Sequence, residues 1–549
     1  MLQLTEKRLQ NLRRRSLGLQ QLAVRVISKK LEFYRTHSDE LEKLKGLPGV
    51  LREKILQVLM KKRCVNLLGR ETEFENLKVV FPLLLSSRTR YIELNGILSF
   101  CPDWFEDRKI EKVTQCCVEL LKQIEIRAPQ VETLIIQRDN PFYTEGVNSY
   151  LRNVEFNQDM VQSLMKMQKL NRLTVSLYCF NLTDLLEICK NLSRLQYINV
   201  GFKYHGHKNR LSPEEVSSSF CNLKEFIFEF PFNEWMSCLC TRNLPNIEVV
   251  QLDPNKIVDW IHLKIHSDRY HGLNFPGASN LRLIGVDLFK DKAKDVEAMP
   301  ALFPKVTCLV VKNITSASLV ENVMPKFDNV RRLHLLNPYG IEVIDKYLIT
   351  YGQKLQALYL GNGSENSKIS LESIFKCCPK LEKLSLLNVC LKPPSSKMDF
   401  FAELKELEWV FHLHNNYSSP LGRSGGGRPD PEIMILSNIL SAPKLEKVKL
   451  EAKNVNQNDL LILNSLIEEN RILNNLNTLH VFSKFPIDEA LATVLKSACA
   501  FLPKLTDFKC GERNKFGEPL LALQSTPFTI SGVTACDFKV IACVFENEK

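Results

Sequence analysis

The sequence predicts an α/β solenoid, a curved parallel sheet with outer helices, preceded by a small α-helical region. Three observations support this prediction. A short apolar pattern recurs about every two dozen residues, the chain is long enough to stack many such units, and its basic N-terminal part has helical periodicity. The 549 residues are 44% hydrophobic and 25% charged, which is typical of a globular protein.

The recurring pattern is apolar-x-x-apolar-x-apolar, whose alternation indicates a short strand with one buried face. Consecutive copies at residues 281, 306, 330, 355, 381 and 404 start 25, 24, 25, 26 and 23 residues apart. Further copies start at residues 131, 170, 195, 223, 247, 445, 476 and 505. Units of this length and pattern are leucine-rich repeats, which stack because one unit cannot bury its apolar face alone.

The predicted order of domains is a head at residues 1–70, a solenoid at residues 71–510 and a C-terminal cap at residues 511–549. Two of the longer intervals are the 34 residues after position 247 and the 41 residues after position 404. The second contains HNNYSSPLGRSGGGRPDPE, whose Gly, Pro and Ser content is typical of a loop. We therefore expect a mobile insertion at residues 412–431.

Charge and composition exclude several classes of protein. Residues 1–70 contain 17 Lys or Arg and 6 Asp or Glu, so the head carries the whole net charge of +11. The neutral remainder argues against broad nucleic-acid binding. No apolar stretch approaches the ~20 residues of a membrane helix, so no membrane partner is expected. The 17 cysteines without a secretory signal indicate reduced, buried thiols in a cytoplasmic or nuclear protein.

No constellation of residues has the spacing of a catalytic site. Gly422 to Gly426 matches G-x-S-x-G, but it lies in the expected loop and not on the strand-to-helix turn that this motif needs. His262 and His266 are four residues apart but lack the Glu of H-E-x-x-H. We therefore predict a protein that is not an enzyme and has no catalytic residue, metal or cofactor.

The residues that flank the central apolar position of each pattern should share the face of the sheet opposite the helices. Mixed polar and aromatic residues on such a face suit the recognition of a protein substrate, although a merely solvated face has the same composition. The predicted substrate-binding residues are Arg172, Tyr197, Glu225, Arg332, His334, Tyr359, Lys383 and Lys447.

The head contains two predicted amphipathic helices. In LGLQQLAVRVISKK, one stripe at helical spacing is formed by Leu19, Leu22, Ala23, Val26 and Ile27. The second helix follows in KGLPGVLREKILQVLMKK, with a proline near its first turn, where a missing N–H costs little. A stripe in so short a segment cannot form a core of its own, so it must pack either on the rest of the protein or on a partner.

The first helix resembles a BC box, by which substrate receptors bind elongin C, in the pattern Leu19-x-x-x-Ala23-x-x-x-Ile27. LPGVL, from Leu47 to Leu51, resembles the cullin box that follows a BC box. CCPKLEKLSL and APKLEKVKL resemble the repeats of ubiquitin-ligase receptors. Together these features resemble the PRAME-like family of receptors, which tolerates Ala where the BC box commonly has Cys.

This resemblance implies a substrate-recognition subunit of an elongin-cullin-RING E3 ubiquitin ligase. Its partners would be elongin B and C, a cullin and a protein substrate of unknown identity. The implied contacts to elongin C are Leu19, Ala23 and Ile27, and those to the cullin are Leu47, Pro48, Val50 and Leu51. The chemistry of ubiquitin transfer would belong to partner subunits.

Three alternatives remain open for the head. LPGVLREKILQVL also resembles the opening of an F-box, which binds the SCF adaptor, although no Trp follows at the expected place. The helices could simply cap the first repeat, which would leave a plain interaction scaffold. The Arg-rich segment from residue 7 to residue 30 is also compatible with a mitochondrial presequence, and Arg13 to Arg15 with a nuclear signal.

Overall fold

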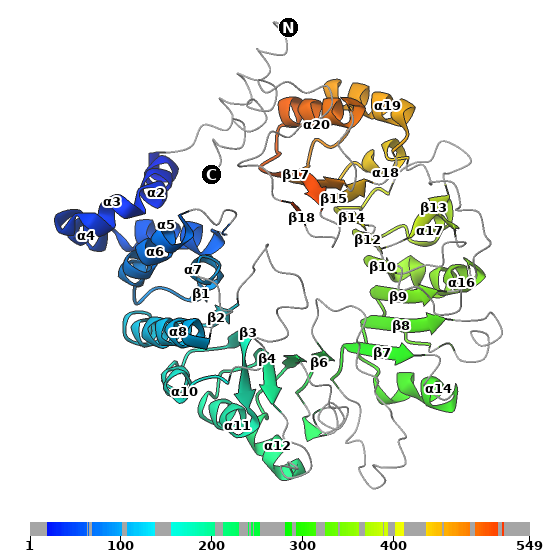
Figure 1. Cartoon of the computed structure of the whole chain (residues 1–549). Coiled ribbons are helices and arrows are strands. Elements are labelled where there is room, and N and C mark those ends of the chain that lie inside the picture. Colours follow the sequence, from blue (N-terminus) through cyan, green and yellow to red (C-terminus); the bar gives the residue numbers. More distant parts are fainter. Residues whose placement is uncertain are drawn as a thin grey trace, which may run out of the picture. The chain divides into compact units, whose positions relative to one another are not determined.

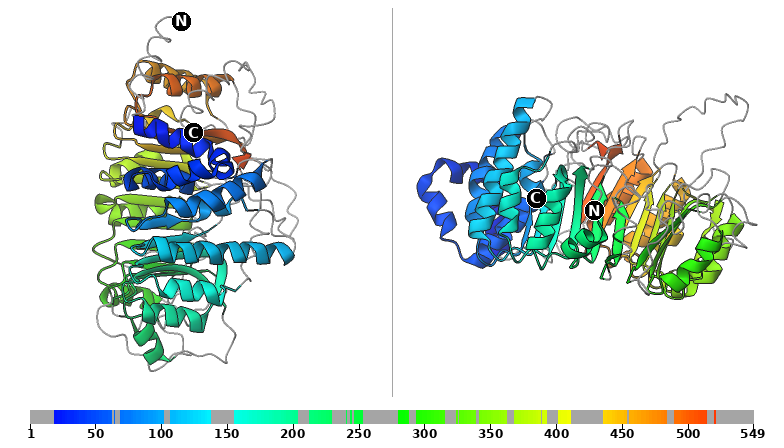
Figure 2. Two further views of the ribbon diagram at one scale, coloured as in Figure 1. Left: turned by 90° about the vertical axis from the view of Figure 1, so that its left-hand side faces the viewer. Right: turned by 90° about the horizontal axis from the view of Figure 1, so that it is seen from below.

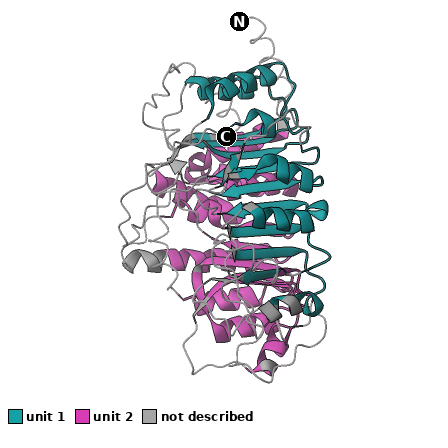
Figure 3. Ribbon diagram, turned by 90° about the vertical axis from the view of Figure 1, so that its right-hand side faces the viewer, with its two compact units in different colours: residues 1–16, 284–549 teal, residues 17–283 magenta. Residues whose placement is uncertain are grey.

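The structure is a computed structural model of the chain (Figures 1 and 2). The residues that it describes are 19–62, 64, 69–101, 107–137, 155–203, 212–229, 240, 243–244, 246–252, 280–287, 293–314, 324, 326–338, 341–361, 368–387, 389–392, 401–410, 435–452, 455–483, 489–513 and 519–520. They fall into two compact units, which we name in the order of the chain. The first unit ends at Leu283 and is magenta in Figure 3, where the key calls it unit 2, and the second begins at Ile284 and is teal, called unit 1 in the key.

The first unit is built on a six-stranded sheet in the order β1 to β6, with all neighbouring strands parallel. Its strands are β1 (Tyr91–Glu93), β2 (Thr133–Ile136), β3 (Arg172–Asn181), β4 (Tyr197–Lys203), β5 (Glu225–Glu229) and β6 (Val249–Leu252). Side chains on one face of the strands, such as those of Leu134, Leu173 and Ile198, are fully buried. A shift of one residue would turn them to the other face, so their burial fixes the register of the sheet.

The second unit contains a ten-stranded sheet in the order β18-β17-β16-β15-β14-β12-β10-β9-β8-β7, in which β18 pairs antiparallel with β17. A separate parallel pair is formed by β11 and β13. The strands are β7 (Leu283–Asp287), β8 (Cys308–Ile314), β9 (Arg332–Pro338), β10 (Ala357–Gly361), β11 (Lys368–Ser370), β12 (Lys383–Leu387), β13 (Cys390–Lys392), β14 (Glu406–Val410), β15 (Lys447–Ala452), β16 (Thr478–Ser483), β17 (Asp507–Arg513) and β18 (Pro519–Leu520).

The strands recur at the spacing of the sequence pattern. From β7 through β8, β9, β10 and β12 to β14, they begin 25, 24, 25, 26 and 23 residues apart, each two residues after a pattern starts. Just before the strands, backbone hydrogen bonds link one repeat to the next. The N–H of Gln356 donates to the carbonyl of Arg331, and the N–H of Glu382 donates to that of Gln356, both at 2.8 Å. The predicted leucine-rich-repeat fold is confirmed.

Helices cover one side of the strands in each unit (Figure 1). In the first unit they are α8 (Asp107–Arg127), α10 (Gln158–Met165), α11 (Leu182–Asn191) and α12 (Pro213–Ser219). In the second they are α14 (Ala293–Leu302), α16 (Ile341–Tyr351), the 3-10 helix η3 (Gly352–Lys354), α17 (Leu371–Cys377), α18 (Ser437–Leu440), α19 (Gln457–Glu468) and α20 (Glu489–Phe501). We call the opposite side of each sheet, where none of the described helices lies, its open face.

The described part of the predicted head, from Leu19 on, is helical, as expected, and belongs to the first unit. Its helices are α2 (Leu19–Lys29), α3 (Leu31–Thr36), α4 (Ser38–Lys45) and α5 (Gly49–Lys61). They are followed by α6 (Arg70–Leu84), which begins at the last residue of the predicted head, and by the short α7 (Asn95–Leu98). The predicted insertion at residues 412–431 lies outside the described residues, as does most of the predicted cap at 511–549. The proposed domain limits therefore stay predictions.

The described thiols are mostly buried in both units, which agrees with the burial that the sequence analysis predicted. The thirteen described cysteines form no disulfide, and only Cys221 is exposed. Burial is the largest cause of the raised pKa of Cys116 and of Cys117, about 12 in each case. These thiols are therefore protonated at neutral pH and act as small apolar side chains of the core.

Candidate interaction surfaces

Helix α5 covers the first strand of the repeat array. Its buried side presents Leu59 and Met60, and the backbone N–H of Glu93 in β1 donates to the Met60 sulfur at 3.1 Å. Gly96 in α7 lies so close to α5 that a Cβ on it would be 2.1 Å from the Leu59 carbonyl oxygen. The α5 part of the head therefore caps the repeats of the first unit.

Helix α2 packs on α5, and two contacts set the direction of the pair. The ammonium of Lys54 donates to the side-chain oxygen of Gln20 at 2.7 Å, and that of Lys62 donates to the carbonyl of Ser28 at 2.9 Å. Both contacts join residues 34 positions apart in the chain, so the two helices run parallel. Lys62 also pairs with Glu73 of α6 at 2.6 Å, which connects the three helices.

The face of α2 that packs inward differs from the predicted apolar stripe. Val24 and Ser28 are buried, and the Ser28 hydroxyl is satisfied by the Val24 carbonyl at 2.7 Å. Leu22 and Val26, which belong to the stripe, are 45% and 53% exposed. Leu22 and Val26 of the predicted stripe are therefore left partly exposed, because α5 contacts a neighbouring arc of the helix.

The three residues predicted to contact elongin C occupy α2. Leu19 is its first residue, and its side chain is outside the described part of the chain. Ala23 and Ile27 are half-buried at the border between the packed face and the exposed residues Leu22 and Val26. The exposed apolar surface of α2 is thus formed by members of the stripe beside the predicted contact positions.

The residues predicted to contact a cullin lie at the start of α5. Pro48 precedes the helix, and its carbonyl accepts from the N–H groups of Leu51 and Arg52 at 2.9 and 3.0 Å. Val50 is 57% exposed, whereas Leu47 and Leu51 are half-buried. The first turn of α5 therefore offers one aliphatic side chain to solvent.

On the open face of the first sheet, three predicted recognition residues are neighbours. Arg172, Tyr197 and Glu225 are in register across β3, β4 and β5. The Arg172 guanidinium carbon lies 4.6 Å from the centre of the Tyr197 ring, within the range of a cation–π contact. Its nitrogen lies 3.8 Å from the Glu225 carboxylate, which is beyond hydrogen-bond distance.

On the open face of the second sheet, predicted lysines lie beside glutamates. Arg332, Lys383 and Lys447 share one row of the register with Glu406. The Glu406 carboxylate pairs with Lys383 at 3.1 Å and with Lys447 at 2.8 Å. One carboxylate is therefore shared by the two predicted lysines.

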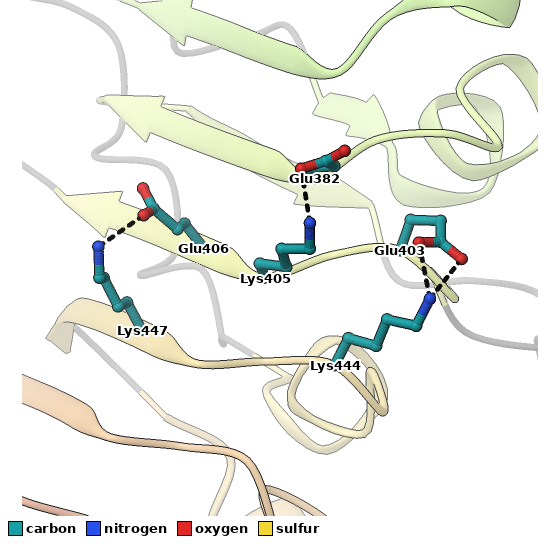
Figure 4. A network of polar contacts seen from close by, with 6 residues as sticks. All are labelled: Glu382, Glu403, Lys405, Glu406, Lys444 and Lys447. Carbon is teal, nitrogen blue, oxygen red and sulfur yellow. Dashed lines mark hydrogen bonds and ion pairs between the residues drawn. The ribbon is translucent and has the colours of Figure 1, made fainter.

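Strands β14 and β15 are joined by three such pairs at one sequence separation. Lys444 pairs with Glu403 at 2.7 Å, Lys447 with Glu406 at 2.8 Å and Lys449 with Glu408 at 2.5 Å. The first two pairs are drawn in Figure 4, together with the pair of Lys405, just before β14, and Glu382, just before β12. The three pairs that join the repeats of β14 and β15 each span 41 residues, so E-x-x-E-x-E faces K-x-x-K-x-K across the interval that contains the predicted insertion.

The sequence analysis missed the glutamates of these pairs. Glu406 and Glu408 flank Leu407 in the copy of the pattern that starts at residue 404, so they occupy positions equivalent to those of the predicted lysines. The same rule that selected Lys383 and Lys447 would have found them. The 41-residue match between the two charge patterns was also visible in the sequence.

Two other predicted residues form an aromatic pair in the second sheet. The rings of His334 and Tyr359 stack with centres 5.4 Å apart. Burial, with smaller effects of Arg332 and Lys383, lowers the pKa of His334 to about 4, so the imidazole is neutral at physiological pH. A Cβ on Gly361 would lie 2.7 Å from the Tyr359 ring, so this glycine is needed to accommodate the ring.

The motifs that the sequence analysis weighed for catalysis or metal binding are not among the described residues. His262, His266 and the Gly422 to Gly426 segment are outside the described residues. Within the described ranges, no group of three or more His, Cys, Asp or Glu could hold a metal ion. Among the helices that the structure describes, none is long and apolar enough to cross a membrane.

Comparisons with known proteins bear on the fold alone. No family model and no curated protein matches the chain. Solved leucine-rich-repeat structures do, including an internalin (InlF) from Listeria monocytogenes, which is 14% identical, with 63% of this chain and 88% of that chain covered and a TM-score of 0.28. The mouse RP105/MD-1 complex is 15% identical, with 71% and 69% covered and a TM-score of 0.29.

A third similar structure is the TLR13–ssRNA13 complex, which is 12% identical, with 71% of this chain and 55% of that chain covered and a TM-score of 0.27. Identities and scores at this level say nothing about function. The assignment of the fold rests on the parallel strands, their spacing and the helices on one side of each sheet. The chain is a leucine-rich-repeat protein with a helical N-terminal region.

Proposed function

We propose that the chain is a non-enzymatic substrate receptor of an elongin-cullin-RING ubiquitin ligase. Helix α2 would dock elongin C, the start of α5 would contact a cullin, and the open faces of the sheets would hold a protein substrate. The proposal combines the motif resemblance of the head with its geometry. Protein recognition by the repeats is its more general part, because repeats present long surfaces of mixed polar and aromatic side chains.

The observation that carries the proposal is the pair of exposed aliphatic side chains on α2. One side of this helix is fixed on α5 through Val24 and Ser28, while Leu22 and Val26 are about half exposed. A helix that is held rigidly and still presents apolar residues suits a partner with a complementary groove. Arg25, Lys29 and Lys30 surround this surface, so the partner's groove should have an acidic rim.

Capping the repeats and docking a partner are compatible in this head. The buried residues of α5 serve the cap, whereas Leu22 and Val26 of α2 contribute little to it. The competing proposal is an F-box-type contact to the SCF adaptor through α5. Most apolar side chains of that helix are buried, and Val50 and Val58 are the large apolar residues that it exposes among those described. This favours α2 as the docking helix.

Co-purification of the full chain with co-expressed elongin B and C tests the proposal. We expect the wild type to form a stable complex, and the double variant Leu22→Asp with Val26→Asp to lose it, because two carboxylates would enter the apolar contact. Leu461→Asp with Ile462→Asp is a matched control, since both side chains are exposed on α19. Leu19→Asp tests the first position of the BC-box resemblance in the same way.

The cullin contact is tested separately with Val50→Asp, which should leave the elongin complex intact and weaken cullin binding. If the folded wild type binds neither elongin C nor a cullin, the ligase proposal through elongin is wrong. The same preparations are then tested with the SCF adaptor. Failure of that complex as well would leave a plain leucine-rich-repeat scaffold.

A further inference from the structure

We propose that Arg172, held on the ring of Tyr197, binds a single carboxylate side chain of a protein partner. This inference rests on the proposed role of the open faces in partner binding. It assigns part of that role to a defined position on the first sheet, and it names the chemistry that the partner must present.

The geometry prepares Arg172 for such a contact. Its guanidinium lies 4.6 Å from the Tyr197 ring centre, so stacking restricts a side chain that otherwise has several free torsions. It also forms a long ion pair with the Glu225 carboxylate at 3.8 Å. Within the described residues, the Arg172 side chain makes no hydrogen bond, and it is 47% exposed. Its planar fork of N–H donors is therefore positioned and can still donate hydrogen bonds to a partner.

The lysines of the second sheet have a different environment. Lys383, Lys447 and Lys449 pair with carboxylates of the same sheet at 3.1, 2.8 and 2.5 Å. Each of these ammoniums already contacts a carboxylate of the same sheet, so a carboxylate from a partner would compete with an existing ion pair. At Arg172 a partner adds hydrogen bonds that the protein itself does not provide. An arginine stacked on a tyrosine is also typical of residues that dominate interface energies.

The surroundings favour an isolated acidic residue beside an apolar one. Tyr91 is exposed on the same face, in register with Arg172 through Thr133, at a distance of two strand spacings, roughly 10 Å. Its ring offers apolar area to a neighbouring residue of the partner. Glu93 and Glu225 lie on the same face and would repel a run of phosphates, which argues against a nucleic acid.

The test is a selection of random dodecapeptides displayed on phage, with the full-length chain as the target. We expect the enriched peptides to contain Asp or Glu next to an aliphatic or aromatic residue. Binding of synthetic versions should be roughly ten- to thirtyfold weaker for Arg172→Ala than for the wild type. Arg172→Lys should be weakened as well, because an ammonium cannot replace a stacked, bidentate fork.

Two further variants separate the cation–π contact from a general loss of structure. Tyr197→Phe keeps the ring and should keep the affinity, whereas Tyr197→Ala should lose it. Lys449→Ala on the second sheet is the charge-matched control and should bind as the wild type does. Equal thermal unfolding midpoints show that each variant is folded.

Three results would overturn the inference: no enriched peptides, enriched peptides without acidic residues, or equal binding to the wild type and Arg172→Ala. The elongin complex, measured on the same preparations, distinguishes this failure from that of the proposed function. Arg172→Ala should retain elongin binding, because α2 is a separate part of the first unit. A wild type that binds acidic peptides but no elongin would contradict the ligase proposal alone.

Discussion

The Lys447 ammonium lies 2.8 Å from the Glu406 carboxylate, although the two residues are separated by 41 positions in the chain. Lys383 approaches the same carboxylate from the other neighbouring strand at 3.1 Å. Glu406 therefore screens two lysines that would otherwise face each other across β14. The single carboxylate of Glu406 in β14 thus forms ion pairs with both neighbouring strands, β12 and β15.

Replacing Glu406 by Gln should destabilise the second unit modestly, by roughly 0.5–1 kcal/mol, because the site is partly exposed and solvent screens the pairs. The hydrogen bond from Lys447 is the largest cause that lowers the pKa of Glu406 below its ordinary value, and Lys383 adds to it. The pairs thus stabilise the fold above the unfolded pKa of about 4.5, and this stabilisation disappears as pH falls through the lower folded value. Urea unfolding of both proteins between pH 7 and pH 3 measures the difference. A difference that grows on acidification would contradict this assignment.

Replacing Gly96 by Ala should destabilise the contact between α7 and α5 by about 1–3 kcal/mol. The new Cβ would lie 2.1 Å from the Leu59 carbonyl oxygen and 2.7 Å from the Met60 Cα, and backbone atoms cannot move aside cheaply. Gly49→Ala is the matched control, since a Cβ there meets nothing within 4 Å. Thermal unfolding should show a lower midpoint for Gly96→Ala only. Equal midpoints would mean that α7 is less closely packed on α5.

Replacing Asp459 by Ala should cost about 1–3 kcal/mol, because it leaves buried N–H groups without an acceptor. The buried Asp459 carboxylate in α19 accepts from the N–H of Leu436 at 2.5 Å and of Ser437 at 3.0 Å, and it also contacts the Ser437 hydroxyl. Asp159→Ala is the control, since that side chain is exposed at the start of α10. Hydrogen exchange at Leu436 and Ser437 reports the local effect. Unchanged protection of these amides would show that the carboxylate does not hold this turn.

Alkylation of the native protein should distinguish the thiols by their environment. Among the thirteen described cysteines, Cys221 is the exposed one and should react first with iodoacetamide at pH 7.5. Cys116 and Cys117 should react only after unfolding, because burial keeps both protonated, with a pKa of about 12. Mass spectrometry of the alkylated peptides gives the order. Early labelling of Cys117 would show that the core around α8 opens readily.

The strands could be predicted closely because their signal is local. Each apolar-x-x-apolar-x-apolar copy contains both the alternation of a strand and the residues that a repeat must bury, so the 23- to 26-residue spacing was visible in the sequence and is found between β7 and β14. The face positions followed from the same alternation, and Arg172, Tyr197 and Glu225 are indeed neighbours.

The orientation of α2 could not be predicted because it depends on another helix. Its sequence offers apolar residues over more than half of the helical circumference, and Val24 was not counted in the stripe. The parallel packing on α5, set by the Lys54 and Lys62 contacts, selects the arc with Val24 and Ser28. The Arg172 site also could not be predicted, because it depends on the distances between side chains on neighbouring strands. The sequence alone does not tell which residues of the open face stack on an aromatic ring and which form ion pairs.

The three glutamate–lysine pairs and Asp459 have a consequence for protein engineering. They fix the chain on both sides of the 24 residues between Val410 and Ile435, so the pairing of β14 with β15 does not depend on how those residues connect them. The entropy of closing a loop rises slowly, by about 0.6 kcal/mol for each doubling of its length. A reporter domain or an affinity tag could therefore be grafted between these two positions without disturbing the repeats.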